Sequence, residues 1–313
     1  FAGQFVAQGG QVLLLDQIFK QPNWSNELRK CYDLYPELKI VFTGSSVMRL
    51  KTDYPAIRDI LKFYYLRGFS FREYLNLMAG THFQPYTLDE IVNNHEHIVK
   101  KILPYISPAQ YFKDYLHHGF YPFFLEHRNF SENLLKTMNM MAEVDILFIK
   151  QIELKYLTKI KKLFYLLAVD GPQAPNISQL AHLIDTSRAT VMNYIKYLTD
   201  ARLLNMIYSP GMDFPKKPAK LMMQNPNLMY AIYPIAINQQ DIMETFFVNT
   251  LWKDHLVNEG SKPQYYIVDN NRKIRVCDAL STNKVRFNSD TIYARYNTEV
   301  GHDNQIPLWL FGF

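Results

Sequence analysis

Two short apolar runs, joined by a helical pattern and each closed by polar residues, constrain the fold of this chain more than any other feature. Residues 12–15 (VLLL) end at Asp16, and residues 39–43 (KIVFT) end at a Gly-Ser-Ser stretch. Continuous apolar runs of this length are typical of strands buried on both faces of a parallel sheet. Residues 23–35 between them carry large side chains at spacings of four, three and four, the stripe of an amphipathic helix. The pattern predicts a βαβ unit with a right-handed crossover, whose carboxyl edge would face a ligand.

The remaining chain changes pattern several times. Ser70 and Glu73 form a capping box that predicts a helix start, and residues 88–155 are mostly helical pattern broken by prolines. Residues 158–208 follow the order helix, helix, turn, helix and strand, which is typical of a winged helix-turn-helix. Further on, we expect strands at 220–223, 265–268, 274–277, 285–287 and 291–296, a helix at 241–258, and an apolar C-terminal end docked on the protein.

Composition excludes several classes of protein. Hydrophobic residues make up 48% of the 313 residues, which is enough for a core, and the length favours two or three domains. The apolar runs are far too short to span a bilayer, and no apolar leader opens the chain. Cys31 and Cys277 alone cannot form a disulfide framework or a zinc ribbon, so we expect a reducing, cytoplasmic setting and no membrane partner. Because the chain begins with Phe1 in helical sequence, we expect a fragment whose N-terminus lies upstream.

Asp16 is the leading candidate for a metal ligand. A carboxylate at the carboxyl end of a buried strand can hold the magnesium of a bound nucleotide, usually through water. The neighbouring strand ends in residues 43–46 (TGSS), which supply hydroxyl groups beside the same edge. An AAA-class P-loop ATPase needs a polar sensor of the terminal phosphate at this place. The alternative is an ordinary strand followed by a turn.

Several sequence blocks, in the same order, resemble a large prokaryotic family of fused AAA-type ATPases. In the first part of the chain they are Asp16 with residues 20–24 (KQPNW), residues 35–46 (YPELKIVFTGSS) and residues 68–75 (GFSFREYL). In the last part they are residues 225–231 (NPNLMYA), 244–247 (ETFF) and 306–313 (IPLWLFGF). The last three resemble that family's C-terminal domain of unknown function, which is related to restriction endonucleases.

The resemblance implies a fold class of α/β plus all-α plus α+β, in four parts. They are the C-terminal part of a parallel-sheet P-loop ATPase core at 1–75, a helical lid at 76–155, a winged helix-turn-helix at 156–214 and a degenerate restriction-endonuclease-like domain at 215–313. It also implies ATP and Mg²⁺, with Asp16 as the metal ligand and Ser46 beside the cofactor. The implied catalytic residues are Gln17, Ser45 and Arg58, with a solvated arginine as the alternative for Arg58.

Two departures from the family pattern bear on activity. The sequence contains no G-x-x-x-x-G-K-[ST] loop, which cradles phosphates and in the family lies upstream of the position where this chain begins. The family's Asp-Glu pair is Asp16-Gln17 here, and a glutamine can orient a water but cannot accept its proton. We therefore expect ATP and Mg²⁺ to bind only with the missing loop restored. We expect an inactive or weakly active ATPase in the chain as it stands.

The expected winged helix offers a second function. The net charge is +5 overall, and residues 150–215 hold 8 Lys and Arg against 5 Asp and Glu, a bias that permits nucleic-acid contact without demanding it. The residues on the outer side of the expected recognition helix are of the types that contact phosphates and base edges: Ser187, Arg188, Thr190, Asn193 and Lys196. The same surface could serve a protein partner.

The tail raises the question of nuclease chemistry. That fold needs a Glu on a helix, then an Asp and a Glu-x-Lys on adjacent strands. Glu244 fits the helix position, but residues 264–266 are not acidic and Arg275 or Val276 stands where the second Glu belongs. Two hypotheses result. One is an ATP-dependent, DNA- or partner-associated ATPase that works as a homo-oligomer. The other is a non-enzymatic DNA- or protein-binding module with an inactive nuclease-like domain.

Overall fold

The N-terminal unit is built on two parallel strands joined by a helix. The computed structural model describes residues 1–45, 54–126, 129–278 and 288–313. Strand β1 (Val12–Leu15) pairs in parallel with β2 (Lys39–Phe42), and the connection between them includes helix α2 (Trp24–Leu34). The parallel strand–helix–strand unit predicted from sequence is therefore confirmed. Helix α1 (Ala2–Ala7) precedes the strands, and the short helices η1 (Ile18–Lys20) and η2 (Pro55–Ile57) complete the unit.

Among the described residues, this two-stranded sheet is covered on one face only. Phe19, Trp24, Leu28 and Ile57 form a small core beneath it. On the opposite face, Leu14 is 72% exposed and Val41 is 55% exposed. The prediction of burial on both faces is thus wrong for these strands. The described residues contribute α2, η1 and η2 to one side of the sheet and no layer to the other.

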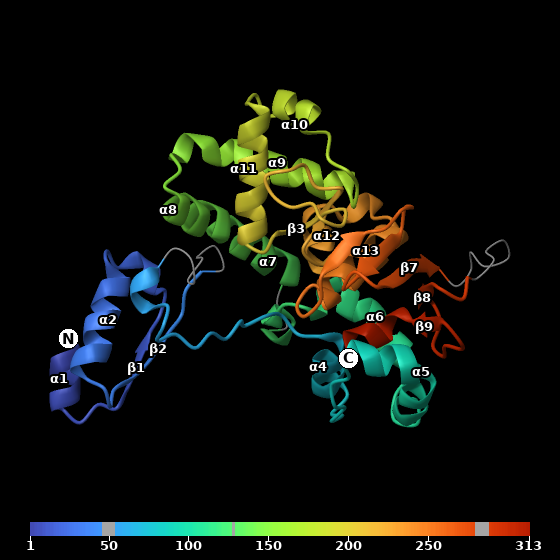
Figure 1. Cartoon of the computed structure of the whole chain (residues 1–313), viewed down its shortest axis with the longest axis horizontal. Coiled ribbons are helices and arrows are strands. Elements are labelled where there is room, and N and C mark those ends of the chain that lie inside the picture. The colour runs from blue at the N-terminus through green and yellow to red at the C-terminus, as the bar shows by residue number, and fades with distance from the viewer. Residues whose placement is uncertain (46–53, 127–128, 279–287) are drawn as a thin grey trace.

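An extended segment, residues 61–70, leads from this unit into a larger one (Figure 1). The first part of the larger unit, as far as residue 150, is helical and includes two π-helical segments, η3 and η5. The helices up to residue 150 are α4 (Phe71–Met78), α5 (Leu88–Ile102), α6 (Pro108–Asp114), η3 (Tyr115–Gly119), η4 (Pro122–Glu126), α7 (Phe130–Met140), the π-helical η5 (Met141–Ile146) and α8 (Leu147–Lys150).

Three helices and an antiparallel hairpin follow. After η6 (Leu154–Tyr156) come α9 (Leu157–Asp170), α10 (Ile177–Leu183) and α11 (Arg188–Asp200), then β3 (Leu204–Ile207) paired with β4 (Lys220–Met223). Gln173, between α9 and α10, bridges to Leu221 and extends this hairpin by one antiparallel contact. Ser187 caps α11 by accepting a hydrogen bond from the Thr190 N–H at 3.0 Å. These elements agree with the order expected for residues 158–208.

The C-terminal part is a five-stranded sheet packed on a helix. The sheet has the order β5 (Val257–Glu259), β6 (Tyr265–Val268), β7 (Arg272–Asp278), β8 (Ile292–Tyr296) and β9 (Gln305–Pro307), with β8 parallel to both of its neighbours. Helices α12 (Pro226–Ile232), η7 (Pro234–Ala236) and α13 (Gln239–Leu251) precede it, and η9 (Leu308–Gly312) ends the chain. The helix predicted at 241–258 ends early because residues 257–259 pair with β6. The strand predicted at 285–287 lies outside the described residues.

One hydrophobic core runs through the whole larger unit. It includes Phe71 near its start and Phe313 at its end, whose ring centroids are 6.3 Å apart. The C-terminal segment from Leu308 to Phe313 is buried, which confirms the expected docking of the apolar end. Among the described residues, no helix is long and apolar enough to cross a membrane.

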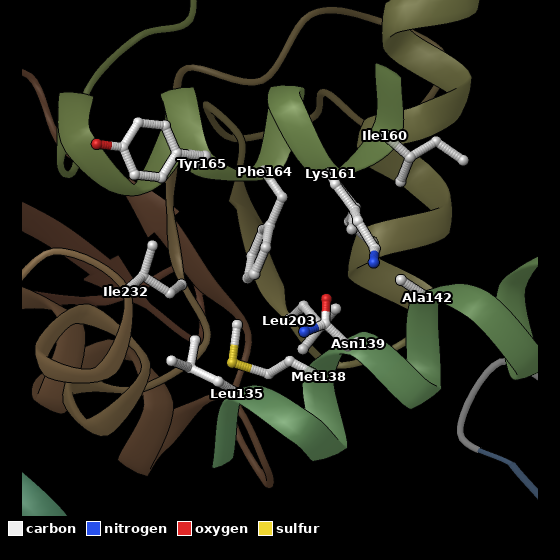
Figure 2. Close-up of a pocket in the computed structure, with 11 residues that line it drawn as sticks. Leu135, Met138, Asn139, Ala142, Ile160, Lys161, Phe164, Tyr165, Leu203 and Ile232 are labelled. Carbon is white, nitrogen blue, oxygen red and sulfur yellow. The ribbon is translucent and has the colours of Figure 1, made fainter. Parts of the chain in front are cut away.

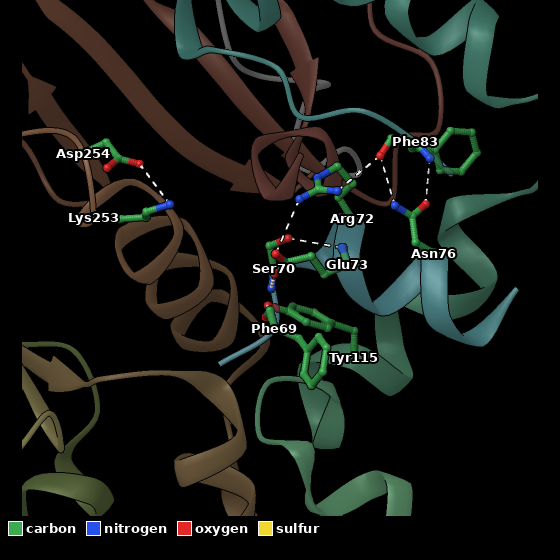
Figure 3. A network of polar contacts seen from close by, with 9 residues as sticks. All are labelled: Phe69, Ser70, Arg72, Glu73, Asn76, Phe83, Tyr115, Lys253 and Asp254. Atoms are coloured by element: carbon green, nitrogen blue, oxygen red, sulfur yellow. Dashed lines mark hydrogen bonds and ion pairs between the residues drawn. The ribbon is translucent and has the colours of Figure 1, made fainter. Parts of the chain in front are cut away.

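The block at residues 68–75 joins the linker to the larger unit (Figure 3). A side chain at Gly68 would meet the Phe120 carbonyl oxygen at 2.4 Å, so only glycine fits without a shift. The Phe69 carbonyl accepts a hydrogen bond from the Tyr115 hydroxyl at 2.7 Å, and the Phe69 N–H donates to Phe120. Ser70 and Glu73 form the predicted capping box at the start of α4. The block is therefore explained by local packing, and its helix packs with α6, η3 and η9 of the larger unit.

Candidate functional site

The carboxyl edge of β1 and β2 brings Asp16 and Thr43 together. Asp16 follows β1 and Thr43 follows β2, and Leu15 lies opposite Phe42, so the next residues on each strand meet. The Thr43 hydroxyl donates a hydrogen bond to Asp16 Oδ1 and accepts one from the Gln17 backbone N–H at 2.9 Å. Asp16 is exposed, and none of the described residues donates a hydrogen bond to its Oδ2.

The turn after β1 is held by backbone hydrogen bonds on both sides. Gln17 has φ 49° and ψ 51°, a left-handed conformation that is uncommon for a residue other than glycine. The Ile18 N–H donates to the Thr43 carbonyl at 3.0 Å, and the Thr43 N–H donates to the Leu15 carbonyl at 2.9 Å. This hydrogen bonding fixes the Asp16 backbone at the edge of the sheet. The Gln17 side-chain amide makes no hydrogen bond to the described part of the chain and is half-buried.

Ser45 contacts the larger unit. Its hydroxyl donates a hydrogen bond to Asp145 Oδ2 at 2.6 Å, and Asp145 belongs to the π-helical segment η5. Burial raises the pKa of Asp145 above its usual range, while the Ser45 hydrogen bond and the charge of Lys20 oppose that rise. Ile149 of α8 packs against the small core of the N-terminal unit beside this contact. The structure therefore places Ser45 at a junction between the two units. Ser46 lies outside the described residues.

Arg58 lies at the end of η2 and is exposed. Its neighbour Asp59 pairs with Arg29 of α2 at 2.9 Å, which fixes this part of the backbone against that helix. The Arg58 guanidinium makes no hydrogen bond or ion pair within residues 1–45 and 54–126 or the later described ranges. It therefore remains able to bind an anion, but no contact joins it to Asp16.

The residues predicted to contact DNA differ in how accessible they are. Ser187, Arg188 and Asn193 are exposed on α11, and Thr190 is half-buried with its hydroxyl hydrogen-bonded to that of Ser187 at 2.8 Å. Lys196 is half-buried and donates to Asp200 Oδ1 at 2.7 Å. Arg188 and Asn193 thus have exposed side chains with no partner among the described residues, whereas the exposed Ser187 hydroxyl already bonds to Thr190.

Asp200 holds two lysines at the C-terminal end of α11. Besides Lys196, Lys150 of α8 lies 3.3 Å from Asp200 Oδ2 and also lies over the Tyr197 ring, 5.7 Å from its centroid. The Asp200 side chain is only 10% exposed. This arrangement ties α11 to α8, which immediately follows the π-helical segment.

The carboxylate of Glu244 has donors on both of its oxygens. Lys220 of β4 donates to Oε2 at 2.6 Å, and the Tyr266 hydroxyl donates to the same atom at 2.5 Å. Gln240 donates to Oε1 at 3.1 Å and to the Val276 carbonyl at 3.0 Å. Burial, with the nearby Glu244 charge, raises the pKa of Tyr266 well above its ordinary value, so this phenol stays protonated. Glu244 is on a helix as predicted, and its charge is matched by an internal ammonium group.

The sequence predicts hydroxyl groups of residues 43–46 beside Asp16, and Thr43 is the one that the structure brings against it. Sequence reasoning did not select Asp145 and Lys220. Their partners are 100 and 24 residues away and lie in other parts of the fold. Within the described ranges, no group of three or more His, Cys, Asp or Glu side chains could hold a metal ion by itself.

Comparisons with known proteins bear on the N-terminal part. Residues 1–75 match a family model described as an AAA domain. An uncharacterized protein of Methanocaldococcus jannaschii is 30% identical over 207 residues, which cover 64% of this chain and 43% of the relative. The chain therefore spans less than half the length of this curated relative. No solved structure matches the chain. The N-terminal residues are thus similar to an AAA-like ATPase domain.

Proposed function

We propose that the N-terminal unit is part of an AAA-type ATPase and contributes the side of its ATP site that holds Mg²⁺. The observation that carries this proposal is the hydrogen-bonded set of Asp16, Thr43 and the Gln17 backbone at the carboxyl edge of parallel strands, within a segment similar to an AAA domain. Open parallel sheets bind ligands at this edge. The hydroxyl of Thr43 orients one oxygen of Asp16 and leaves the other toward solvent.

The residues present fit a hydrated magnesium ion. Mg²⁺ keeps several waters and is usually held through one or two carboxylates together with substrate phosphates. Asp16 is exposed and has one oxygen without a donor among the described residues, so it can accept a hydrogen bond from a metal-bound water. The ion would neutralise phosphate charge, while Asp16 and Thr43 would orient its water shell.

In our proposal, Gln17 makes the hydrolysis of ATP at this site slow. A glutamine side chain can donate or accept a hydrogen bond, so it can orient a water molecule. It cannot take the proton of that water, because general-base catalysis needs a group whose pKa suits proton transfer. A glutamate at this position would supply that group. We therefore propose that nucleotide binding dominates over turnover in the natural protein.

The test uses the protein encoded by the complete reading frame of this gene. Asp16→Asn should weaken Mg²⁺-dependent ATP binding at least tenfold in calorimetry, because the amide keeps the shape but loses the charge. Gln17→Glu should raise the turnover of ATP by about 10²-fold or more, the low end of a general-base contribution. Glu37→Gln, which removes an exposed carboxylate in the loop before β2, is the matched control and should change neither. Unchanged binding in Asp16→Asn would refute the proposal that Asp16 helps to hold Mg²⁺.

A specific observation favours a second function, DNA contact by a winged helix. Helices α9, α10 and α11 and the β3–β4 hairpin follow the order of that motif, and Arg188 and Asn193 are exposed on α11. We propose that Arg188 neutralises a backbone phosphate and that Asn193 contacts a base edge. The pairing of Lys196 with Asp200 favours a structural role for that lysine. The tail would then be a restriction-endonuclease-like domain whose Glu244 is bound internally. A partner protein on the same surface is the alternative.

A duplex titration at two salt concentrations tests this second function. Arg188→Ala should flatten the log–log salt dependence of binding by about one unit, because one phosphate contact is lost. Asn193→Ala should change sequence preference more than it changes the salt slope. Lys162→Ala, an exposed lysine of α9 with no partner among the described residues, is the control for general charge loss. Equal slopes for the wild type and Arg188→Ala would exclude DNA contact through the start of α11.

A further inference from the structure

A cavity of about 170 Å³ lies between α7 with the π-helical segment η5 on one side and α9 on the other (Figure 2). Its inner wall includes buried apolar side chains of α9, of α11 and of the segment just before β3, namely Ile160, Leu198 and Leu203. An engineered apolar cavity of ~150 Å³ in another protein stays dry and binds benzene. The cavity therefore has room for one six-membered ring.

The cavity has an apolar end and a polar end. Leu135, Ile232 and Phe164 line the apolar end, and Asn139 and Lys161 lie together at the other (Figure 2). Asn139 is exposed at the mouth, and its side-chain amide makes no hydrogen bond to any described residue. A ligand that fills the cavity could therefore gain a hydrogen bond from Asn139 at this end, while the Tyr165 hydroxyl lies on the side of Ile232 (Figure 2).

The polar end is electrically neutral. The Lys161 ammonium is paired with the carboxylate of Glu143, which belongs to η5. An anionic ligand would have to compete with Glu143 for Lys161, whereas the Asn139 amide is available as both donor and acceptor. These features favour a neutral group at the mouth over a carboxylate or phosphate.

We propose that this cavity binds a neutral monocyclic aromatic molecule with one hydroxyl group, that is, a phenol, whose ring lies among the apolar side chains and whose hydroxyl bonds to Asn139. The proposal is independent of the nucleotide site. The cavity wall includes Leu198 of α11 and Ala142 of η5. A bound ligand would therefore contact α11, which carries the exposed Arg188, and η5, whose Asp145 accepts a hydrogen bond from Ser45.

The experiment uses phenol, toluene and benzoate as probes, with binding to the full chain measured by calorimetry and by the shift in melting temperature. Asn139→Leu keeps the size of the side chain and removes its hydrogen bond. In that variant the ratio of phenol to toluene affinity should fall by about threefold to tenfold, the range of a single neutral hydrogen bond. Benzoate should bind at least tenfold more weakly than phenol to the wild type.

Ala142→Leu should abolish binding of both neutral probes by filling the cavity, whereas Ala189→Leu adds the same volume on the exposed side of α11 and should not. Leu135→Phe provides a second way to fill the cavity if Ala142→Leu does not fold, as judged by circular dichroism. Absence of phenol binding to the wild type would overturn the proposal. So would an unchanged affinity ratio in Asn139→Leu, or undiminished binding in a folded cavity-filled variant.

Discussion

Replacing Asp241 with asparagine should stabilise the protein at neutral and alkaline pH. The Asp241 carboxylate lies at the start of α13 against Gly171, where an added Cβ atom would be 2.7 Å from its Oδ2. Gly171 ends α9, and the C-terminal end of a helix carries partial negative charge. Burial, and then the nearby charge of Glu244, raises the pKa of Asp241 to about 6, with Lys220 opposing the rise.

The sign and size of the effect follow from this raised pKa. The folded protein holds a proton on Asp241 that the unfolded chain releases, so stability falls as the pH rises from 3.8, the unfolded value, through about 6. The difference between a pKa of about 6 and the ordinary value of 3.8 corresponds to about 3 kcal/mol. Because the group is only half-buried, solvent screening reduces this to about 1–2 kcal/mol. Asparagine removes the charge, so the cost present above pH 6 should disappear.

Urea unfolding of the wild type and Asp241→Asn at pH 4, 6 and 8 provides the measurement. We expect the variant to gain about 1–2 kcal/mol in the free energy of unfolding at pH 8, less at pH 6, and almost nothing at pH 4. Asp213→Asn, at an exposed carboxylate in the β3–β4 loop, is the control and should stay within about 0.5 kcal/mol at every pH. A gain in Asp241→Asn that is the same at pH 4 and pH 8 would show that the carboxylate charge is not the cause.

Three further substitutions test other parts of the structure. Lys220→Met should destabilise the protein by about 3–5 kcal/mol in urea unfolding, because it leaves the buried charge of Glu244 without its ammonium partner; the double variant with Glu244→Gln should recover part of that loss, and no recovery would contradict the pairing. Gly68→Ala should lower the melting temperature, because its methyl group meets the Phe120 carbonyl, and an unchanged value would show that the linker backbone can shift freely. Ser45→Ala should speed proteolysis within residues 61–70 by loosening the contact between the two units, and equal cleavage rates would argue against that contact in solution.

Local sequence patterns predicted most of the helices and strands, because interactions between residues close in the sequence determine where these elements begin. The capping box at Ser70 fixes the start of α4, and Ser187 fixes the start of α11, through hydrogen bonds three residues away. The strand at 265–268 was predicted with its observed bounds, since apolar and aromatic residues fill it and turns flank it. In contrast, the helix from 239 ends at Leu251 rather than 258, because pairing of β5 with β6 overrides helical pattern there.

The candidate site was predictable only in part. Asp16 and the hydroxyls after β2 could be placed at one edge, because parallel strands end on the same side of a sheet. The destination of Ser45 could not, since Asp145 lies 100 residues away on a π-helical segment. Burial of both faces was expected for β1 and β2 from their apolar composition, yet Leu14 and Val41 are exposed. An apolar run shows that a strand can be buried, and neighbouring layers decide whether it is.

The continuous core of the larger unit has a mechanical consequence. Helices near the linker, the three-helix segment with its hairpin, and the C-terminal sheet share apolar contacts from Phe71 to Phe313, and the Lys220–Glu244 pair links the hairpin to α13. Close-packed interiors resist deformation, so we expect these parts to behave as one rigid body. Residues 61–70, the Ser45–Asp145 hydrogen bond and the packing of Ile149 join this body to the N-terminal unit. Loosening these contacts should therefore shift the body as a whole and leave its internal packing unchanged.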